Sequence, residues 1–180
     1  MRYRERNHRK RIEYLRSLRR IIESKGSEHI VYLDESGFER TSDRTHGWGL
    51  RGKKVHGECS GNKRPRTSLL SAKRGNNLLA PILFEGNTDA TLFNYWLQNH
   101  LFEEFGASST IIMDNATFHK TALTRQLIEE AGHTLLFLPP YSPDFNPIEK
   151  DFAIMKRRRQ FLPSDSTIDD VVRSYASYLN

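Results

Sequence analysis

Three carboxylates stand where short apolar segments end or a helix begins, and their placement constrains what this chain can fold into. Asp34 ends I-V-Y-L-D and Asp114 ends T-I-I-M-D, two short runs rich in β-branched residues that are typical of buried strands. Glu149 follows the proline-punctuated segment S-P-D-F-N-P-I, where a helix is expected to begin. An acid at the end of a buried strand is costly unless something positive meets it. The three acids therefore predict a site for divalent metal at one edge of a sheet.

The spacing of these acids fits a metal-dependent phosphoryl-transfer site. Magnesium prefers octahedral oxygen coordination and is usually held by one or two carboxylates together with substrate phosphate. In a two-metal site the ions lie about 3.5–4 Å apart and act on the attacking and the leaving oxygen. We expect Asp34 and Asp114 to bridge both ions and Glu149, reaching from a helix, to hold one. The 34 residues from 115 to 148 hold one helix, one strand and one loop, which returns the chain to the same sheet edge.

Positive charge is unevenly placed along the chain. The net charge is +6, yet residues 1–25 carry +7 and the remaining 155 residues sum to −1. Residues 51–74 hold eight basic residues against one Glu. Basic clusters apart from a carboxylate cluster suit a polyanion held near metal, although solvated basic faces explain the same charge equally well. The candidate DNA contacts in these clusters are Lys53, Lys54, Arg64, Lys156, Arg157, Arg158 and Arg159.

Cysteine and hydropathy restrict the compartment. Cys59 is the single cysteine, which excludes an internal disulfide and fits a reducing environment. No run of about 18 apolar residues indicates a membrane span. The basic N-terminus lacks the apolar region of a secretory signal. These features predict a cytoplasmic protein without a membrane partner, and a DNA substrate would make it nucleoid-associated.

Apolar periodicity and turn residues predict an α/β architecture with a mixed sheet. Residues 1–27 are interpreted as a basic N-terminal helix or linker, and residues 28–180 as the catalytic domain. Trp48 and Trp96 are expected in the core, and Asn146 is expected to cap a helix that begins at Pro147. The expected helices span 5–23, 88–104, 120–131, 147–159 and 164–179, and the expected strands span 30–34, 47–50, 67–72, 77–84, 109–113 and 133–138.

Three motifs resemble the mariner-like superfamily of DDE transposases, in its bacterial insertion-sequence branch. They are V-Y-L-D-E-S-G-F at Asp34, I-M-D-N-A-T-F-H-K at Asp114, and L-P-P-Y-S-P-D-F-N-P-I-E, which ends at Glu149. The last motif is highly specific, and the 34-residue gap before Glu149 matches a characteristic spacing of that superfamily. The resemblance covers about residues 29–160. It implies a ribonuclease-H-like mixed sheet flanked by helices on both faces.

The resemblance also implies a chemistry. Asp34, Asp114 and Glu149 would be the catalytic and metal-binding triad for Mg²⁺, or Mn²⁺ as a substitute, with two ions when DNA is bound. The reaction would be cut-and-paste transposition, in which water cleaves strands at the element ends and the freed 3′-hydroxyl attacks target DNA. Asn115 and His119 are candidate supporting residues and Tyr141 is a candidate DNA contact, with a structural role as the alternative for each.

One departure from the superfamily pattern bears on partners. Members usually carry an N-terminal helix-turn-helix region that binds the element ends, whereas here only the basic helix at 5–23 precedes the strand of Asp34. A separate helix-turn-helix subunit or frame, and a homodimer, are the protein partners this suggests. The alternative function is an inactive, truncated transposase fragment that acts as a DNA-binding or regulatory partner, and the intact triad argues against it. A nuclease or integrase of the same fold is a third hypothesis.

Overall fold

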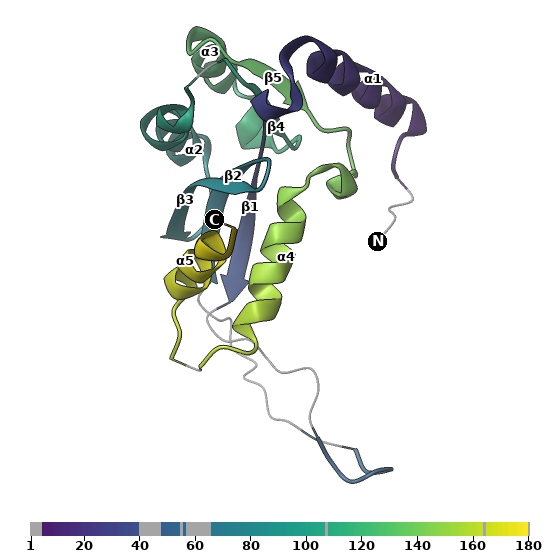
Figure 1. Cartoon of the computed structure of the whole chain (residues 1–180), viewed down its shortest axis with the longest axis vertical. Coiled ribbons are helices and arrows are strands. Elements are labelled where there is room, and N and C mark those ends of the chain that lie inside the picture. The colour runs from purple at the N-terminus through teal and green to yellow at the C-terminus, as the bar shows by residue number, and fades with distance from the viewer. Residues whose placement is uncertain are drawn as a thin grey trace.

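The computed structural model describes residues 5–39, 48–54, 56, 66–106, 108–163 and 165–179, which include a five-stranded mixed sheet (Figure 1). Its strands lie in the order β3-β2-β1-β4-β5. Arg64 and Cys59 lie outside the described residues. The strands are β1 (Ile30–Glu39), β2 (Arg66–Arg74), β3 (Asn77–Glu85), β4 (Thr110–Met113) and β5 (Thr134–Phe137).

Strand pairing places the first two acids side by side. β1 pairs antiparallel with β2 and parallel with β4, and β4 pairs parallel with β5. In the parallel pair the last aligned residues are Tyr32 and Ile112. Asp34 and Asp114 each follow their aligned residue by two positions, so both acids lie at the same level of the sheet. The carboxyl end of the parallel strands is therefore the edge at which they meet.

Helices cover both faces of the sheet. Successive side chains of a strand point to opposite faces, so β1 has apolar residues on each face for a helix to pack against. On one face Val31 and Leu33 belong to a buried cluster with residues of α2 (Ala90–Trp96) and α3 (Ala122–Glu130). On the other face Ile30 packs with Tyr14 of α1 (His8–Lys25). Phe38, on that same face, packs with residues of α4 (Ile148–Arg159) and α5 (Ile168–Leu179). The expected mixed sheet with helices on both faces is thus confirmed, and α4 runs alongside β1 (Figure 1).

Local sequence signals start several of these helices. The side chains of Asn7, Asp89 and Thr121 accept hydrogen bonds from backbone amides in the first turns of α1, α2 and α3. The hydroxyl of Thr167 accepts from the amide of Asp170 at the start of α5. The helix expected over 88–104 is α2 followed by a π-helical segment, Leu97–Leu101, and a short 3-10 segment, Phe102–Glu104. No helix among the described residues is long and apolar enough to cross a membrane.

Three expectations from the sequence are wrong. The strand expected over 30–34 continues to Glu39, because its pairing with β2 extends to that residue, so Asp34 lies within β1 rather than at its end. Residues 48–50 form no strand, and Trp48 is fully exposed rather than part of the core, whereas Trp96 is fully buried. The segments that flank Trp48 in the sequence are polar and turn-rich, so a single aromatic residue is not enough to bring this segment into the core. Asn146 does not cap α4: that helix begins at Ile148, Pro147 occupies the cap position, and no side chain caps it.

Candidate active site

The three acids line one pocket of about 600 Å³ beside the middle of β1 and the carboxyl end of β4. Asp34 comes from β1, Asp114 from the residue after β4, and Glu149 from the first turn of α4. Sequence reasoning therefore correctly expected the three side chains to gather. The pocket is lined by Asp34, Asp114, Asn115, Ala116, Leu138, Pro139, Pro140, Tyr141, Ser142, Pro143, Asn146 and Glu149.

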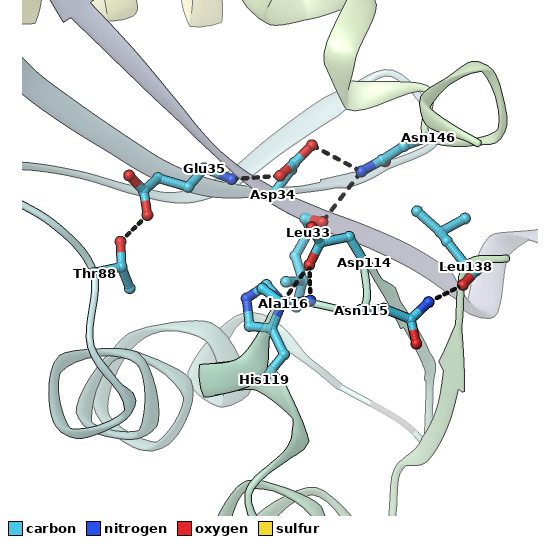
Figure 2. A network of polar contacts seen from close by, with 10 residues as sticks. All are labelled: Leu33, Asp34, Glu35, Thr88, Asp114, Asn115, Ala116, His119, Leu138 and Asn146. Atoms are coloured by element: carbon cyan, nitrogen blue, oxygen red, sulfur yellow. Dashed lines mark hydrogen bonds and ion pairs between the residues drawn. The ribbon is translucent and has the colours of Figure 1, made fainter. Parts of the chain in front are cut away.

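Asp34 is held from two sides (Figure 2). Its Oδ1 accepts a hydrogen bond from the amide of Glu35 at 2.8 Å, and its Oδ2 accepts from the side-chain amide of Asn146 at 3.1 Å. Burial, together with the negative charges of Glu149 and Asp114, raises the pKa of Asp34 to about 8, although the hydrogen bond from the Glu35 amide acts to lower it. The site therefore gathers more negative charge than its own residues neutralise.

Asn146 is the functional residue that the sequence did not reveal. The same amide nitrogen that meets Asp34 also donates to the carbonyl of Leu33 at 3.3 Å, so it fixes the backbone and the side chain at this point of β1 (Figure 2). The expected role as a helix cap failed because this NH₂ group faces two acceptors on β1. A helix cap needs the side-chain oxygen to accept from the helix backbone, and Asn146 instead uses its donors on the strand.

Asp114 is directed by its own neighbours. Its Oδ1 accepts from Nδ1 of His119 at 2.7 Å and from the amide of Ala116 at 2.9 Å. Burial by itself would raise the pKa of Asp114, but the hydrogen bond from His119, the Ala116 amide and the charges of His119 and Lys120 hold it below its usual value. Asp34 and Asp114 thus have opposite pKa shifts within one pocket.

His119 and Asn115 have the supporting contacts expected of them. His119 is buried, and its ring packs 4.4 Å from that of Phe93 and 4.2 Å from that of Phe118 between centroids. It contacts Asp114 through Nδ1 and is not among the residues that line the pocket. Asn115 donates its side-chain amide to the carbonyl of Leu138, which ties the end of β4 to the residue that follows β5 (Figure 2).

The residues fit a divalent cation by their chemistry. The pocket presents carboxylate oxygens, the ligands that Mg²⁺ prefers. The pKa of Asp34 is raised first by burial and then by the negative charges of Glu149 and Asp114, and a cation would offset those charges. Among the described residues no three His, Cys, Asp or Glu side chains are already close enough to hold one ion together. Binding by all three acids therefore requires their side chains to move toward one another.

Comparison with known proteins identifies the family. A family model described as "DDE superfamily endonuclease" matches residues 29–169. The chain belongs to this family. The match spans all three acids, and it confirms the resemblance seen in the three motifs. The family is one of nuclease-type enzymes.

Several solved structures share the fold of this DDE endonuclease chain. The Mos1 strand transfer complex has a TM-score of 0.75 and 18% identity, covering 99% of this chain and 56% of that chain. The Mos1 paired-end complex with the left transposon end has a TM-score of 0.73 and 20% identity, covering 88% of this chain and 51% of that chain. The Mos1 catalytic domain alone has a TM-score of 0.59 and 16% identity, covering 99% and 92%. These likenesses confirm the ribonuclease-H-like fold.

A curated relative matches a shorter stretch of the DDE endonuclease chain. The uncharacterized protein y4pE/y4sA of Sinorhizobium fredii is 37% identical over 65 residues, which are 33% of this chain and 46% of that protein. The chain also spans about half the length of the Mos1 proteins in the two DNA complexes.

The candidate DNA contacts of this DDE endonuclease have distinct surroundings. Tyr141 lines the pocket, and its side chain is 55% exposed on a backbone with φ of 55°. That left-handed conformation is uncommon for a bulky residue and is maintained here at the pocket rim. Lys53 and Lys54 are exposed and do not line the pocket.

The four basic residues at the end of α4 are not equivalent. Arg157 is exposed, and Lys156 lies with its Nζ 5.5 Å from the ring centre of Phe38. Arg158 lies 5.6 Å from the ring centre of Tyr175, and Arg159 donates to the carbonyl of Glu39. Burial lowers the pKa of Lys156, and the charge of Glu149 acts against that shift, which places this cation within electrostatic reach of the triad.

Proposed function

We propose that this chain is the catalytic domain of a transposase that cuts and joins DNA strands at the ends of an insertion element, using Mg²⁺ or Mn²⁺. The observation that carries the proposal is the gathering of Asp34, Asp114 and Glu149 in one pocket within a DDE endonuclease match. Mos1 structures of the same fold are described with a transposon end, with Mg and with Mn, which supports the choice of substrate and metal.

The metal would be held by Asp34, Asp114 and Glu149. When bound there, two divalent ions would activate the attacking oxygen and stabilise the leaving oxygen of an in-line phosphoryl transfer. Nothing else in the pocket offers a comparable set of hard oxygen ligands.

The protein's own residues prepare the carboxylates for this task. Asn146 fixes the orientation of Asp34, and His119 holds Asp114 in its ionised form, because a hydrogen bond to the charged form of an acid favours that form. Asp34 releases its proton when positive charge enters the pocket, since mutual repulsion with Glu149 and Asp114 contributes to its raised pKa. Tyr141 lines the pocket, and Lys156 lies within electrostatic reach of Glu149 and Asp34, so both would be available to a DNA strand bound at the triad.

The partners that go with this proposal are double-stranded DNA at the element ends and at the target. The basic residues on α4 and the exposed Lys53 and Lys54 provide sequence-independent attraction to phosphates. Recognition of the end sequence would come from a helix-turn-helix region on a separate subunit or frame, and pairing of two ends from a homodimer. The nucleoid is the compartment in which such an activity operates.

The test is metal-dependent strand cleavage of a duplex that carries an element end. We expect Asp114→Ala to abolish cleavage while thermal unfolding remains cooperative. The matched control is Glu35→Gln, because Glu35 adjoins Asp34 but its carboxylate accepts from the hydroxyl of Thr88 and does not line the pocket (Figure 2). Cleavage by Asp114→Ala at the wild-type rate would refute the mechanism. A wild-type chain that binds DNA but never cuts it would support the inactive fragment instead.

A further inference from the structure

The basic N-terminal helix reaches the turn that leads into the candidate active site. The guanidinium of Arg11 on α1 donates two hydrogen bonds to Asp144, Nη1 to Oδ1 at 2.9 Å and Nη2 to Oδ2 at 2.7 Å. Its Cζ lies 3.8 Å from the ring centre of Phe145, and its side chain is only 15% exposed. Tyr14, one turn along the helix, stacks on the same ring with centroids 5.4 Å apart and planes 18° apart. Arg11 and Tyr14 of α1 therefore contact two consecutive residues of one turn, Asp144 and Phe145.

The turn that contains Asp144 and Phe145 is followed directly by Asn146, which contacts Asp34 and Glu149. The amide of Phe145 donates to the carbonyl of Ser142 at 3.0 Å, and the amide of Asn146 donates to that of Pro143 at 2.9 Å, so Pro143–Phe145 is one tight 3-10 turn. The next residue, Asn146, donates to Asp34 and accepts at its carbonyl from the amide of Glu149. A displacement of the turn is therefore passed within one residue to the orientation of Asp34.

We propose that Arg11 is a positioning residue for the carboxylate site, acting through Asp144, Phe145 and Asn146. The inference rests on the proposed function for its effect on cleavage, but the coupling between α1 and Asn146 is a property of the fold. It makes α1 part of the catalytic unit and gives the segment that precedes it a route to the active site.

The chemistry of arginine suits this role. A guanidinium presents its donors in a planar fork that matches a carboxylate, and the same plane stacks on an aromatic ring. A lysine keeps the charge but makes neither the paired hydrogen bonds nor the flat contact with Phe145. The Asp144 carboxylate is more than half exposed, so solvent weakens the charge attraction and the geometry of the fork carries the effect.

Arg11 has a matched control on the same helix. Arg9 is also paired with a carboxylate, Glu13, at 2.9 Å, but both side chains are exposed and both belong to α1. Arg9→Gln therefore removes one positive charge and one ion pair from the helix without touching the turn. A simple loss of attraction between a basic helix and DNA affects Arg9→Gln and Arg11→Met alike.

The experiment compares Arg11→Met, Arg11→Lys, Asp144→Asn and Arg9→Gln in the full chain. The first readout is the ¹H–¹⁵N spectrum of the Asn146 side-chain NH₂ group without metal, and the second is the Mn²⁺ concentration that gives half-maximal cleavage. We expect the Asn146 resonances to move in the three turn variants and not in Arg9→Gln. We also expect these variants to need roughly 10- to 100-fold more Mn²⁺, the usual loss when a ligand's support is removed.

The outcomes separate this inference from the proposed function. Unmoved Asn146 resonances in folded Arg11→Met and Asp144→Asn overturn it, whatever the cleavage activity. A Mn²⁺ requirement in Arg11→Met equal to that of Arg9→Gln overturns the inference as well, because Arg11 then only attaches α1 to the rest of the domain and does not position the carboxylates. If the wild-type chain does not cut DNA, the proposed function fails, while the Asn146 resonances still decide the coupling. If Arg11→Met does not fold, the same two measurements on Asp144→Asn test the inference, because Asp144 is the exposed partner of Arg11.

Discussion

Asn146 and Asp34 lie 112 residues apart in the chain and are joined by a hydrogen bond of 3.1 Å. The bond connects the strand that carries the first acid to the turn that precedes the helix of the third. Glu149 depends on the same residue, because its amide donates to the Asn146 carbonyl. The relative position of two of the three acids is thus set by one asparagine.

Asn146→Ala is expected to weaken metal binding more than it weakens the fold. The substitution frees Asp34 Oδ2 and leaves the Leu33 carbonyl without this donor, at a cost of about 1–3 kcal/mol for lost buried hydrogen bonds. Loss of support for a metal-binding carboxylate typically reduces affinity or activity by roughly 10- to 100-fold. Calorimetric titration with Mn²⁺ and chemical denaturation of the same sample measure the two effects. Unchanged Mn²⁺ affinity would show that Asp34 needs no such support.

Several parts of the site could be predicted from sequence because their signals are local. The strand that carries Asp34 and the strand end before Asp114 follow from apolar β-branched runs, although the first strand continues to Glu39. The start of a helix near Glu149 follows from the preceding prolines. The caps at Asp89 and Thr167 are equally local. Each of these features depends on residues within four positions of one another.

Other parts could not be predicted because their partners are distant in sequence. Asn146 has the residue type of a helix cap, and only the position of β1 reveals two better acceptors. The pairing of Arg11 with Asp144 spans 133 residues, so the charge of α1 by itself indicated nothing about the active site. Trp48 shows the opposite error, since a large apolar residue was expected in a core that its segment does not join.

His119→Phe is expected to shift the acid limb of the cleavage profile toward higher pH. Phenylalanine keeps the ring packing against Phe93 and Phe118 but removes the hydrogen bond to Asp114 Oδ1. The pKa of Asp114 then rises from its lowered value, so Asp114 is protonated at a higher pH than in the wild type. Cleavage rates between pH 4 and pH 8 at saturating Mn²⁺ measure the shift. An unmoved acid limb with a lower plateau would mean that His119 acts only through packing.

The metal-free protein is expected to lose stability as pH rises from about 4 to about 8. The unfolded chain releases the Asp34 proton near its ordinary pKa of 3.8, whereas the folded chain keeps it until about 8. Within that window the folded state binds more protons, so the free energy of unfolding decreases with pH. Asp34→Asn should flatten this dependence, and excess Mg²⁺ should add about 2.7 kcal/mol at 100 times its Kd. Denaturation at several pH values, with and without Mg²⁺, tests both effects; a wild-type slope in Asp34→Asn would assign the loss elsewhere.

Arg157→Gln is expected to flatten the salt dependence of DNA binding. Each phosphate contact that is removed lowers the slope of log K against log salt by about 0.9 for duplex DNA. Arg157 is exposed, whereas Arg159 already donates to the Glu39 carbonyl, so Arg159→Gln should lower the slope by less. Fluorescence anisotropy with a labelled duplex over a range of salt, without divalent metal, gives the slopes. Equal slopes for wild type and Arg157→Gln would remove this residue from the DNA contacts.

The buried ion pair between Lys73 and Asp151 is expected to determine how α4 is rotated about its own axis. Lys73 Nζ on β2 lies 2.6 and 2.8 Å from the two carboxylate oxygens of Asp151, and the Tyr175 hydroxyl on α5 donates to the same group. The two charged side chains are 15% and 5% exposed. Asp151 is two residues from Glu149 on the same helix, so this contact sets which side of α4 faces the pocket.

Replacing either Lys73 or Asp151 alone should lower the free energy of unfolding strongly, and replacing both should lower it less. A buried charge left without its partner costs about 3–5 kcal/mol, whereas an apolar replacement of the whole pair is often neutral. We therefore expect Lys73→Met and Asp151→Leu each to destabilise the fold strongly and the double variant to recover part of the loss. Urea denaturation of the four proteins measures the coupling, with the exposed Glu129→Gln as a control for charge removal. Additive losses in the double variant would show that Lys73 and Asp151 stabilise the domain independently and that α4 is oriented by its apolar residues alone.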